Sequence, residues 1–517
     1  YEISACLVGS EMCIRDSPRS KTEQEMLPLH IFPYAPHTLC MKITGDLKRD
    51  FSALKELLPA EDILSFDFAA EGGITFRILF CDPVADKELL GTLVVRPLMR
   101  YRGGRKAEDV GEGLASPEMR TFSDLEELAG EVLAGNPVLL WDGMDEGLVV
   151  GTKKVFLRAV MEPPTGVTVK GPREGFIEDI KVNTSLIRRR LKTGELKIVF
   201  SKIGRRSQTF VALCYLEGTA NEAVVKGVEK RLKSIDIDGI PDSSYLADFL
   251  CSRPHALIKQ VGTTEKPDVF CAKLLEGRVG VLADGSPIAL TLPYLFVEDL
   301  QAGEDYFVPP LRATLTRVLR LLAMLAAMYL PAFYVAAELF KLQLFPVKLL
   351  LTIAGSIRDI PLSPSLEMLL VLLMLEVLNE ASIRMPKYVG MALSVVGALV
   401  LGETAVRAGF FSTPAIIIVA FSAIGLYAVP DLIEVTSMVR LLLLLAAGSL
   451  GTYGIILATA FLLLELTATE NYGVPLLSPF APARPRDMKD SIVKFGLRSL
   501  KLRPKTLMSP NKRRMNG

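Results

Sequence analysis

The apolar character of residues 311–468 constrains this chain more than any other feature. This stretch is dominated by Leu, Ala, Val and Ile and carries few charges, whereas residues 1–310 have the mixed composition of an ordinary α/β or α+β protein. The apolar run over 315–340 is long enough, at about 1.5 Å per residue, to cross a bilayer core of roughly 30 Å. We therefore expect a helical membrane region behind a large soluble region.

The number of membrane crossings is left open between four and six. Five apolar segments are clear, and a sixth, residues 342–357, is short and broken by Pro346. Basic residues flank the first span, and the tail over 484–517 carries eleven Lys and Arg against two Asp. The positive-inside rule then places both ends of the membrane region in the cytoplasm, which requires an even number of crossings. The clear segments cover 315–340, 366–378, 388–405, 414–429 and 439–466.

The fold class that we predict is α/β (α+β) for a soluble N-terminal region of two lobes, followed by an all-α polytopic transmembrane bundle. The basic tail is expected to be a solvated, partly disordered segment or to lie near anionic lipid head groups, and the two interpretations are compatible.

The expected domains are residues 1–17, which resemble translated adapter sequence; 18–45, a flexible leader; 46–165, the first lobe; 166–310, the second lobe; 311–470, the transmembrane domain; and 471–517, the cytoplasmic tail.

Local patterns predict the elements of the two lobes. Helical spacing favours helices over 46–58, 180–191 and 221–232, and a helix over 121–133 that is N-capped by Ser123, with Glu126 in the capping-box position. A further helix is expected to begin near Asp82. The approximate repetition of the element order suggests two related lobes. The expected strands and hairpins cover 74–80, 137–150, 154–160, 196–203, 209–217, 235–237, 269–274 and 280–292.

Several function classes lack support in the sequence. The seven cysteines are scattered without a CxxC pair and the three histidines are dispersed, so we predict no metal and no cofactor. Neither GPREGF nor KIGRRSQ matches a phosphate-binding loop. The basic residues around 188–190 and 205–206 are not interleaved with aromatic residues, so nucleic acid is not an expected partner. No GxSxG or HExxH motif occurs, and no enzymatic activity is predicted.

Acidic residues in or beside the apolar segments are the first candidates for function, because an ionisable group at bilayer depth is costly and usually faces a bundle interior or a water-filled path. Gly390, Ser394 and Gly397 share one face of a helix that ends at Glu403, which permits either close packing or a narrow pore. The acidic candidates are Glu338, Glu367, Glu376, Glu380, Glu403 and Glu465; Glu380 also has Arg384 four residues on, the spacing of a local ion pair.

Several long motifs, in order along the chain, are similar to those of the A-subunits of spore germination receptors, the GerA family, which includes the stage V sporulation AF-type proteins. The similarity covers about residues 45–505. The motifs are GPREGFIEDIKVNTSLIRRRLKTGELKI at 171–198, GRRSQT at 204–209, RLKSIDIDGI at 231–240, LLEGRVGVLADGSP at 274–287, GEDYF at 303–307, YLPAFYVA at 329–336, LNEASIRMPKYVGMALSVVGALVLGETAVRAG at 378–409 and YGVPLLSPFAPARPRDMKDSIVK at 472–494.

The resemblance implies a role that spacing alone does not. Such A-subunits lie in the inner membrane of the endospore, in contact with lipid, together with a transporter-like B subunit and a C-subunit lipoprotein. They are expected to form homo-oligomers, with a pentamer as the expected form, that act as nutrient-gated ion channels. The resemblance then implies a pore lined by Gly390, Ser394, Val395, Gly397, Ala398 and Glu403, and oligomer contacts by Arg173, Glu174, Arg188, Arg189 and Arg190 of the cytoplasmic lobes.

Two departures from the family pattern bear on this interpretation. Many relatives carry Gln where Glu403 stands here, and a ring of Glu403 side chains facing the lumen would favour cations. The usual Asn-Tyr-Ser-Leu stretch after the fourth apolar segment is replaced by DLIEVTSM at 431–438, which leaves the subgroup open. A non-conducting membrane scaffold that assembles receptor subunits remains the alternative function.

Overall fold

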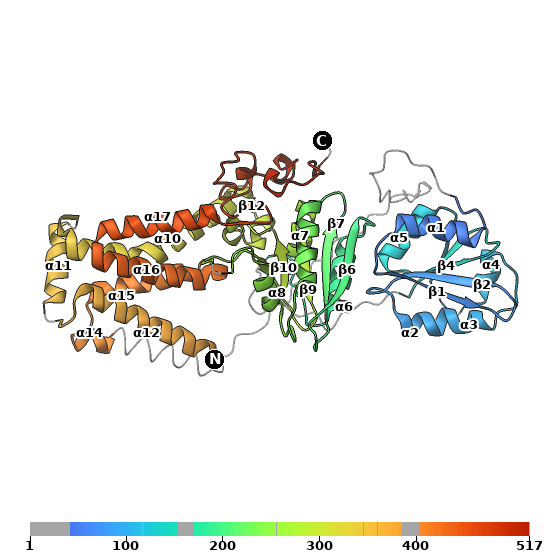
Figure 1. Ribbon diagram of the computed structural model, residues 1–517, viewed down its shortest axis with the longest axis horizontal. Helices are drawn as coiled ribbons and strands as arrows, with labels where there is room; N and C mark the ends of the chain where they lie inside the picture. The colour runs from blue at the N-terminus through green and yellow to red at the C-terminus, as the bar shows by residue number, and fades with distance from the viewer. Residues whose placement is uncertain are drawn as a thin grey trace, which may run out of the picture. The chain divides into compact units, whose positions relative to one another are not determined.

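The computed structural model of the chain describes residues 42–515, apart from residues 115, 117, 153–169, 255, 345, 359 and 385–402. It contains two five-stranded antiparallel sheets, a helical region and a folded C-terminal segment (Figure 1). We call residues 42–152 lobe 1 and residues 170–309 lobe 2. The strand expected over 154–160 lies outside the described residues.

Lobe 1 is a sheet with the strand order β1-β2-β4-β5-β3. In Figure 1, α1 and α5 lie on one face of this sheet and α2 and α3 lie on the other. The core is centred on Trp141, which is fully buried and whose ring lies 5.9 Å from that of Phe76. The elements are α1 (Leu47–Leu57), β1 (Ile63–Ala69), β2 (Thr75–Cys81), α2 (Lys87–Leu90), η1 (Gly91–Val95), α3 (Arg96–Met99), α4 (Ala107–Glu112), β3 (Met119–Phe122), α5 (Leu125–Ala134), β4 (Val138–Trp141) and β5 (Gly147–Val150).

Lobe 2 has the strand order β6-β7-β9-β10-β8. Apolar residues of α6 and α9 pack together on the sheet in one core cluster, and those of α7 and α8 pack in a second cluster. The elements are α6 (Ile180–Arg190), β6 (Leu196–Ile203), β7 (Thr209–Leu216), α7 (Glu222–Lys233), α8 (Ser243–Leu250), β8 (Gly262–Thr264), α9 (Pro267–Glu276), β9 (Val279–Ala283), β10 (Ala289–Leu292), η2 (Phe296–Leu300) and η3 (Gly303–Phe307).

The two lobes are built to one plan. Each places its third strand at the sheet edge beside the fifth, so the strand order is the same in both. The turn between the last two strands also makes the same contact: Gly143 N donates to Gly45 O over 2.8 Å in lobe 1, and Gly285 N donates to Glu178 O over 2.8 Å in lobe 2. Both turn glycines have positive φ, at 82° and 84°. These equivalences indicate an internal repeat of an entire lobe.

Several expectations for the lobes are wrong in detail. The N-cap of α5 is Asp124, whose carboxylate accepts from Glu126 N, and Ser123 precedes it. The helix expected to begin near Asp82 begins instead after Asp86, which caps α2. Residues 269–274, read as a strand, lie inside α9, because Pro267 and the glycine at its C-terminal end delimit a helix. Residues 235–237 form no strand.

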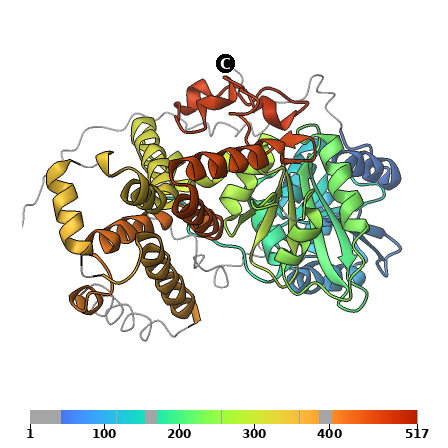
Figure 2. The ribbon, with the colours of Figure 1, turned by 60° about the vertical axis from the view of Figure 1, so that its left-hand side comes forward.

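The helical region contains two helices that are long and apolar enough to cross a membrane, Pro310–Phe340 and Pro430–Leu450, and two shorter apolar helices, Thr413–Leu426 and Thr452–Ala468, among the described residues. Figures 1 and 2 show α16 and α17 side by side. The helices are α10 (Pro310–Phe340), α11 (Val347–Ile357), α12 (Pro364–Arg384), α14 (Ala405–Arg407), α15 (Thr413–Leu426), α16 (Ile433–Leu450) and α17 (Thr452–Ala468), with the short η4 (Leu342–Leu344) and η6 (Pro430–Leu432).

The segment over 439–466, read as one long span, is two helices. The chain reverses at Gly451, which has φ +61° and ψ −138°, a conformation open to glycine. A Cβ at this position would lie 2.8 Å from the ring of Phe340. The uninterrupted apolar pattern hides this reversal, because both helices are apolar on most of their surface.

Both ends of the helical region lie beside lobe 2. At the start, Arg320 of α10 donates to Leu300 O over 3.1 Å. At the end, Asn471, which follows α17, donates to Gln260 O over 2.8 Å and accepts from Ser252 Oγ over 2.6 Å. The first helix of the region therefore leaves from lobe 2, and the last helix brings the chain back to it.

The C-terminal segment, residues 469–515, is folded onto lobe 2 rather than disordered. It includes the short strands β11 (Glu470–Asn471) and β12 (Val474–Pro475). Ser509 Oγ donates to Thr219 O over 2.6 Å, and Arg503 Nε donates to Leu275 O over 2.7 Å. The Asp487 carboxylate accepts from the backbone N–H groups of Lys505 and Thr506, so the segment doubles back on itself.

Candidate functional site

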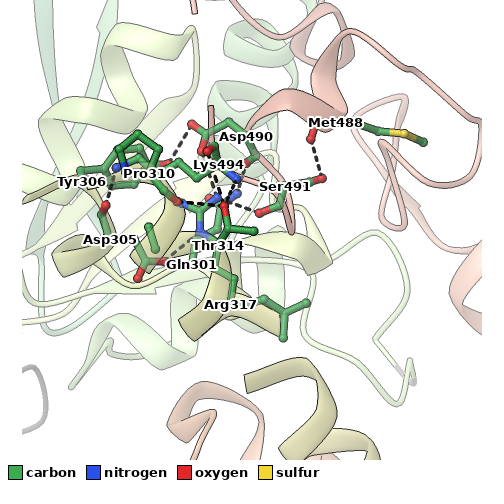
Figure 3. Close-up of polar contacts among 12 residues, drawn as sticks. Gln301, Asp305, Tyr306, Pro310, Thr314, Arg317, Met488, Asp490, Ser491 and Lys494 are labelled. Atoms are coloured by element: carbon green, nitrogen blue, oxygen red, sulfur yellow. Dashed lines mark hydrogen bonds and ion pairs between the residues drawn. The ribbon is translucent and has the colours of Figure 1, made fainter. Parts of the chain in front are cut away.

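Arg317 of α10 lies at the centre of a buried polar junction between lobe 2, the first apolar helix and the C-terminal segment (Figure 3). Its side chain is fully buried. Nε donates to Asp305 Oδ2 over 2.9 Å, and Nη1 donates to Asp490 Oδ1 over 3.0 Å and to Ser491 O over 2.7 Å. One guanidinium thus connects segments almost two hundred residues apart in the sequence.

Asp305 is the second centre of the junction. Its carboxylate accepts from Arg320 as well, Nη1 to Oδ2 over 2.9 Å and Nη2 to Oδ1 over 3.0 Å. Its backbone carbonyl accepts from the Lys494 ammonium. Burial alone would raise the pKa of Asp305, but the hydrogen bonds and charges of Arg320 and Arg317 outweigh it and hold the pKa below its ordinary value. Asp305 is therefore ionised, as a partner for two arginines must be.

The remaining contacts of the junction fix the C-terminal segment against α10 and η3. Tyr306 donates its hydroxyl to Asp490 Oδ2 over 3.0 Å, and Gln301 donates its side-chain amide to Asp490 O over 2.5 Å. Lys494 N donates to Thr314 Oγ1 over 3.0 Å. The Lys494 ammonium lies 4.7 Å from the centroid of the Tyr306 ring, within the range of a cation–π contact.

A buried charge network continues from the junction into lobe 2. Glu298 is paired with Arg278 and, over 2.8 Å, with Lys273 of α9. Burial would raise the pKa of Glu298, but these two cations lower it to about 2. The neighbouring Asp299 accepts from the Tyr294 hydroxyl and pairs with Lys259 over 3.1 Å. Burial raises its pKa to about 6, against the effect of Lys259.

A second polar cluster lies among the apolar helices. Arg440 of α16 is 1% exposed; it donates from Nη2 to Glu376 Oε1 over 2.5 Å and from Nη1 to Ser422 Oγ over 3.1 Å. The Ser422 hydroxyl in turn donates to Ala327 O of α10 over 2.8 Å. Helices α10, α12, α15 and α16 are therefore linked at one level by a buried cation and its partners.

The predicted intramembrane acids have different surroundings. Glu376 pairs with Arg440, whereas Glu380 is exposed and pairs with Arg384 at i+4, as the spacing predicts. Glu367 is buried and accepts from Ser412 N, and Glu465 is half-buried.

Of the residues proposed to line a pore, only Glu403 falls within the described part of the chain. Its side chain is about half exposed and forms an ion pair with Arg407, one turn further on, over 2.5 Å. The charge of Glu403 is therefore opposed by a neighbour within the same chain. Gly390, Ser394, Val395, Gly397 and Ala398 lie outside the described residues.

The residues expected at an oligomer contact divide into two groups. Glu174 pairs with Arg189 and Arg190, and these side chains are partly exposed; Arg173 is exposed. Arg188 is different, because its side chain is fully buried and paired with Asp62 of lobe 1. The expectation that Arg188 contacts a second copy is wrong for this fold: in the basic run Arg188–Arg190, α6 turns its first arginine inward.

Sequence reasoning missed Arg317 and Arg440 as buried partners. In the sequence, Arg317 is one of the basic residues that flank the first span, and its partner Asp490 is one of the two Asp in the basic tail. One signal was available: GEDYF, which contains Asp305, and RDMKDSIVK, which contains Asp490, are both among the motifs of the resemblance. Arg440 is the only charged residue between residues 435 and 464. A charge in so apolar a stretch is a candidate for function for the same reason as the intramembrane acids.

The fold and the junction together define a protein in which a repeated α/β region is joined by buried charge to the first of several apolar helices. The model of the family described as Bacillus/Clostridium GerA spore germination protein matches residues 52–506. This chain therefore belongs to the GerA family.

Individual relatives agree with this assignment. Spore germination protein KA of Bacillus subtilis (strain 168) is 36% identical over 466 residues, which cover 89% of this chain and 86% of the relative. Uncharacterized membrane protein YfkQ of the same organism is 33% identical over 475 residues, covering 91% and 93%. Spore germination protein GerLA of Bacillus cereus is 32% identical over 478 residues, covering 91% and 97%.

A solved structure is also similar. The N-terminal domain of the A subunit of the Bacillus megaterium spore germinant receptor GerK3, determined by crystallography, is 26% identical in sequence. The match covers 50% of this chain and 99% of that chain, with a TM-score of 0.37.

Proposed function

We propose that this chain is the A-subunit of a spore germinant receptor and that its helical region forms an ion path in a homo-oligomer of the spore inner membrane. Its partners are a transporter-like B subunit and a C-subunit lipoprotein. The relatives named as spore germination proteins, and the family match over most of the chain, support the A-subunit role. The channel activity rests on the polar groups held among the apolar helices.

The observation that carries the proposal is the buried junction at Arg317. A ligand-gated channel needs a connection between the part that senses and the part that conducts. Arg317 belongs to the first apolar helix, yet its hydrogen bonds go to Asp305 of lobe 2 and Asp490 of the C-terminal segment. A displacement of lobe 2 therefore moves α10 or breaks a buried ion pair, and breaking such a pair costs several kcal/mol.

The orientation with lobes and tail on the spore core side is part of the proposal. Two observations support it: the helical region begins and ends beside lobe 2, and basic residues flank both of its ends. Positively charged flanks favour the cytoplasmic side. An even number of crossings, four or six, is consistent with this arrangement.

Ion flux through liposomes that contain the purified chain, with and without its partner subunits, tests the channel function. We expect Val395→Phe to block flux and Glu403→Gln to lower the preference for cations. Glu380→Gln is the matched control for Glu403→Gln, because Glu380 forms the same kind of exposed i,i+4 pair with Arg384. A loss of Arg407 should strengthen cation preference, since it removes the charge that opposes Glu403.

Two outcomes would contradict the channel. Wild-type flux in both Val395→Phe and Glu403→Gln would remove the pore assignment. An absence of flux under every condition, together with retained binding of partner subunits, would favour the non-conducting scaffold.

A further inference from the structure

We propose that Tyr334, Glu338 and Glu367 form a binding site for a divalent, oxygen-seeking cation in the helical region. This inference goes beyond the proposed function, because it requires only the folded chain and not ion conduction. It rests on two buried carboxylates and a buried hydroxyl, four of whose oxygen atoms have no hydrogen-bond partner among the described residues.

The three side chains come from neighbouring positions in two packed helices. Tyr334 and Glu338 are one turn apart on α10, so they share a face. Tyr334 packs in one core cluster with Met368, the residue after Glu367. The residue before Ser412, whose backbone N–H donates to Glu367, belongs to the same cluster. The site is therefore assembled where the end of α10 meets the first turn of α12.

All three groups are buried and retain unused hydrogen-bonding capacity. Glu367 is 1% exposed, and Tyr334 and Glu338 are each 7% exposed. Both carboxylate oxygens of Glu338, the Oε2 of Glu367 and the hydroxyl of Tyr334 have no hydrogen-bond partner among the described residues. A buried carboxylate without donors is costly, so these oxygens point to a ligand that supplies positive charge.

Helix ends act differently on the two carboxylates. Glu367 lies in the first turn of α12 and accepts from Ser412 N, at the start of α15, over 2.5 Å. Both helix N-termini stabilise it as an anion. Glu338 lies in the last turn of α10, which contains no basic residue and where the helix dipole is negative. The uncompensated charge is therefore greatest at Glu338, on the side of the site where a cation would bind.

The set of ligands favours a divalent cation. Two carboxylates neutralise one divalent ion, and oxygen ligands in a flexible arrangement are those that Ca²⁺ prefers. The last carbonyl groups of a helix have no partner within it, so the end of α10 adds acceptors. No described Lys, Arg or His forms an ion pair with Glu338 or Glu367; Lys341, three residues on, is exposed to solvent.

The position of the site along α10 places it far from the Arg317 junction. Helix α10 starts at the Arg317 junction and extends over 31 residues, or roughly 46 Å. Glu338 is two residues from its far end, and α12 and α15 both begin there. The site therefore lies at the end of the helical region opposite lobe 2.

Calcium binding to the purified full-length chain in neutral phosphatidylcholine nanodiscs tests the proposal. After removal of metal by a chelator, radioactive Ca²⁺ should bind saturably at one ion per chain, with Mg²⁺ and K⁺ as competitors. We expect Glu338→Gln and Glu367→Gln each to weaken binding about tenfold or more and Tyr334→Phe to weaken it less. Glu380→Gln, an exposed acid on α12, should bind as the wild type does.

The thermal transition of the same samples separates a lost site from a lost fold. Ca²⁺ should raise the transition temperature of the wild type and leave Glu338→Gln unchanged. Without Ca²⁺, Glu338→Gln should be at least as stable as the wild type, because a neutral amide replaces an uncompensated charge. Saturable binding that survives both Gln variants would overturn the proposal. So would an absence of binding combined with a pH-dependent stability that Glu338→Gln abolishes, since the pair would then hold only a proton.

Discussion

Arg188 of lobe 2 and Asp62 of lobe 1 form a bidentate ion pair in which both side chains are fully buried. Arg188 Nε donates to Asp62 Oδ2 over 2.7 Å and Nη2 donates to Oδ1 over 2.6 Å. The same guanidinium donates to the carbonyl oxygens of Thr193 and Leu196. The pair therefore joins the two lobes, and Arg188 also supplies hydrogen bonds to carbonyl groups at the start of β6 and in the loop before it.

Replacing Asp62 by Asn should destabilise lobe 1 by about 3–5 kcal/mol, because Arg188 then stays buried without a counter-charge. Trp141, the only tryptophan of the chain, is buried in lobe 1. Its fluorescence during urea unfolding therefore reports on this lobe. The double variant Asp62→Leu with Arg188→Met should recover much of the loss, and Asp67→Asn, which breaks the more exposed pair with Arg77, should cost less than about 1 kcal/mol.

Replacing Arg317 by Gln should release the C-terminal segment, because Asp490 loses its buried partner. Asp305 keeps Arg320 and is less affected. We expect protease cleavage after residue 484 to become at least tenfold faster, which corresponds to about 1.4 kcal/mol or more of local opening. Arg312→Gln, an exposed arginine of the same helix, is the matched control and should leave the cleavage rate unchanged.

The stability of lobe 2 should fall when the pH drops from 4.5 toward 2. Arg278 and Lys273 hold the pKa of Glu298 at about 2, against an ordinary value of 4.5. The unfolded chain binds the proton more tightly, so the stabilisation is complete above pH 4.5 and is lost through protonation below it. The shift corresponds to roughly 3 kcal/mol. Hydrogen exchange of β9 and β10 measures the effect, and Glu298→Gln should remove the dependence in this window.

The titration of Asp299 should change the stability of the fold in the opposite direction, at higher pH. Burial raises its pKa to about 6 from an ordinary value of 3.8, so the folded chain binds this proton more tightly than the unfolded chain does. Stability should therefore decrease by roughly 2 kcal/mol as the pH rises from 4.5 to 6. Asp299→Asn should abolish this decrease, and Lys259→Met should move its midpoint to higher pH. An unchanged profile in Asp299→Asn would show that another group titrates.

Replacing Gly451 by Ala should destabilise the helical region by about 1–3 kcal/mol, because an alanine has to adopt φ +61° and its Cβ would contact the Phe340 ring. Thermal unfolding in detergent measures the loss. Gly355→Ala is the matched control: a Cβ there meets no atom within 4 Å, and alanine favours the interior of α11. That variant should be neutral or slightly stabilised.

The sequence predicted what depends on local periodicity and composition. The helices that begin after Asp46 and Asn221, the hairpin over 280–292 and the paired strands over 196–217 follow from alternation and capping residues. The prediction failed where the local sequence suits two structures about equally well. Ser123 and Asp124 can both cap a helix, and residues 269–274 suit a strand until the glycine at 277 ends α9 with φ +105°.

The candidate site was harder to predict because its members are distant in sequence. Asp305, Arg317 and Asp490 look like ordinary surface charges when each is read among its neighbours. Only tertiary packing removes them from water and makes their pairing necessary. The motifs that carry Asp305 and Asp490 were recognised through the family resemblance, which gave no reason for their presence.

The repeated plan of the two lobes has a consequence for how this chain arose. Asp46 and Asp179 each cap the first helix of their lobe, and the same turn contact closes each sheet, although the two amino-acid sequences have diverged. A tandem duplication of one ancestral module accounts for this correspondence. After the duplication, the second copy came to hold the contacts with α10 and with the residues after α17, and the first copy is joined to its sibling through Asp62.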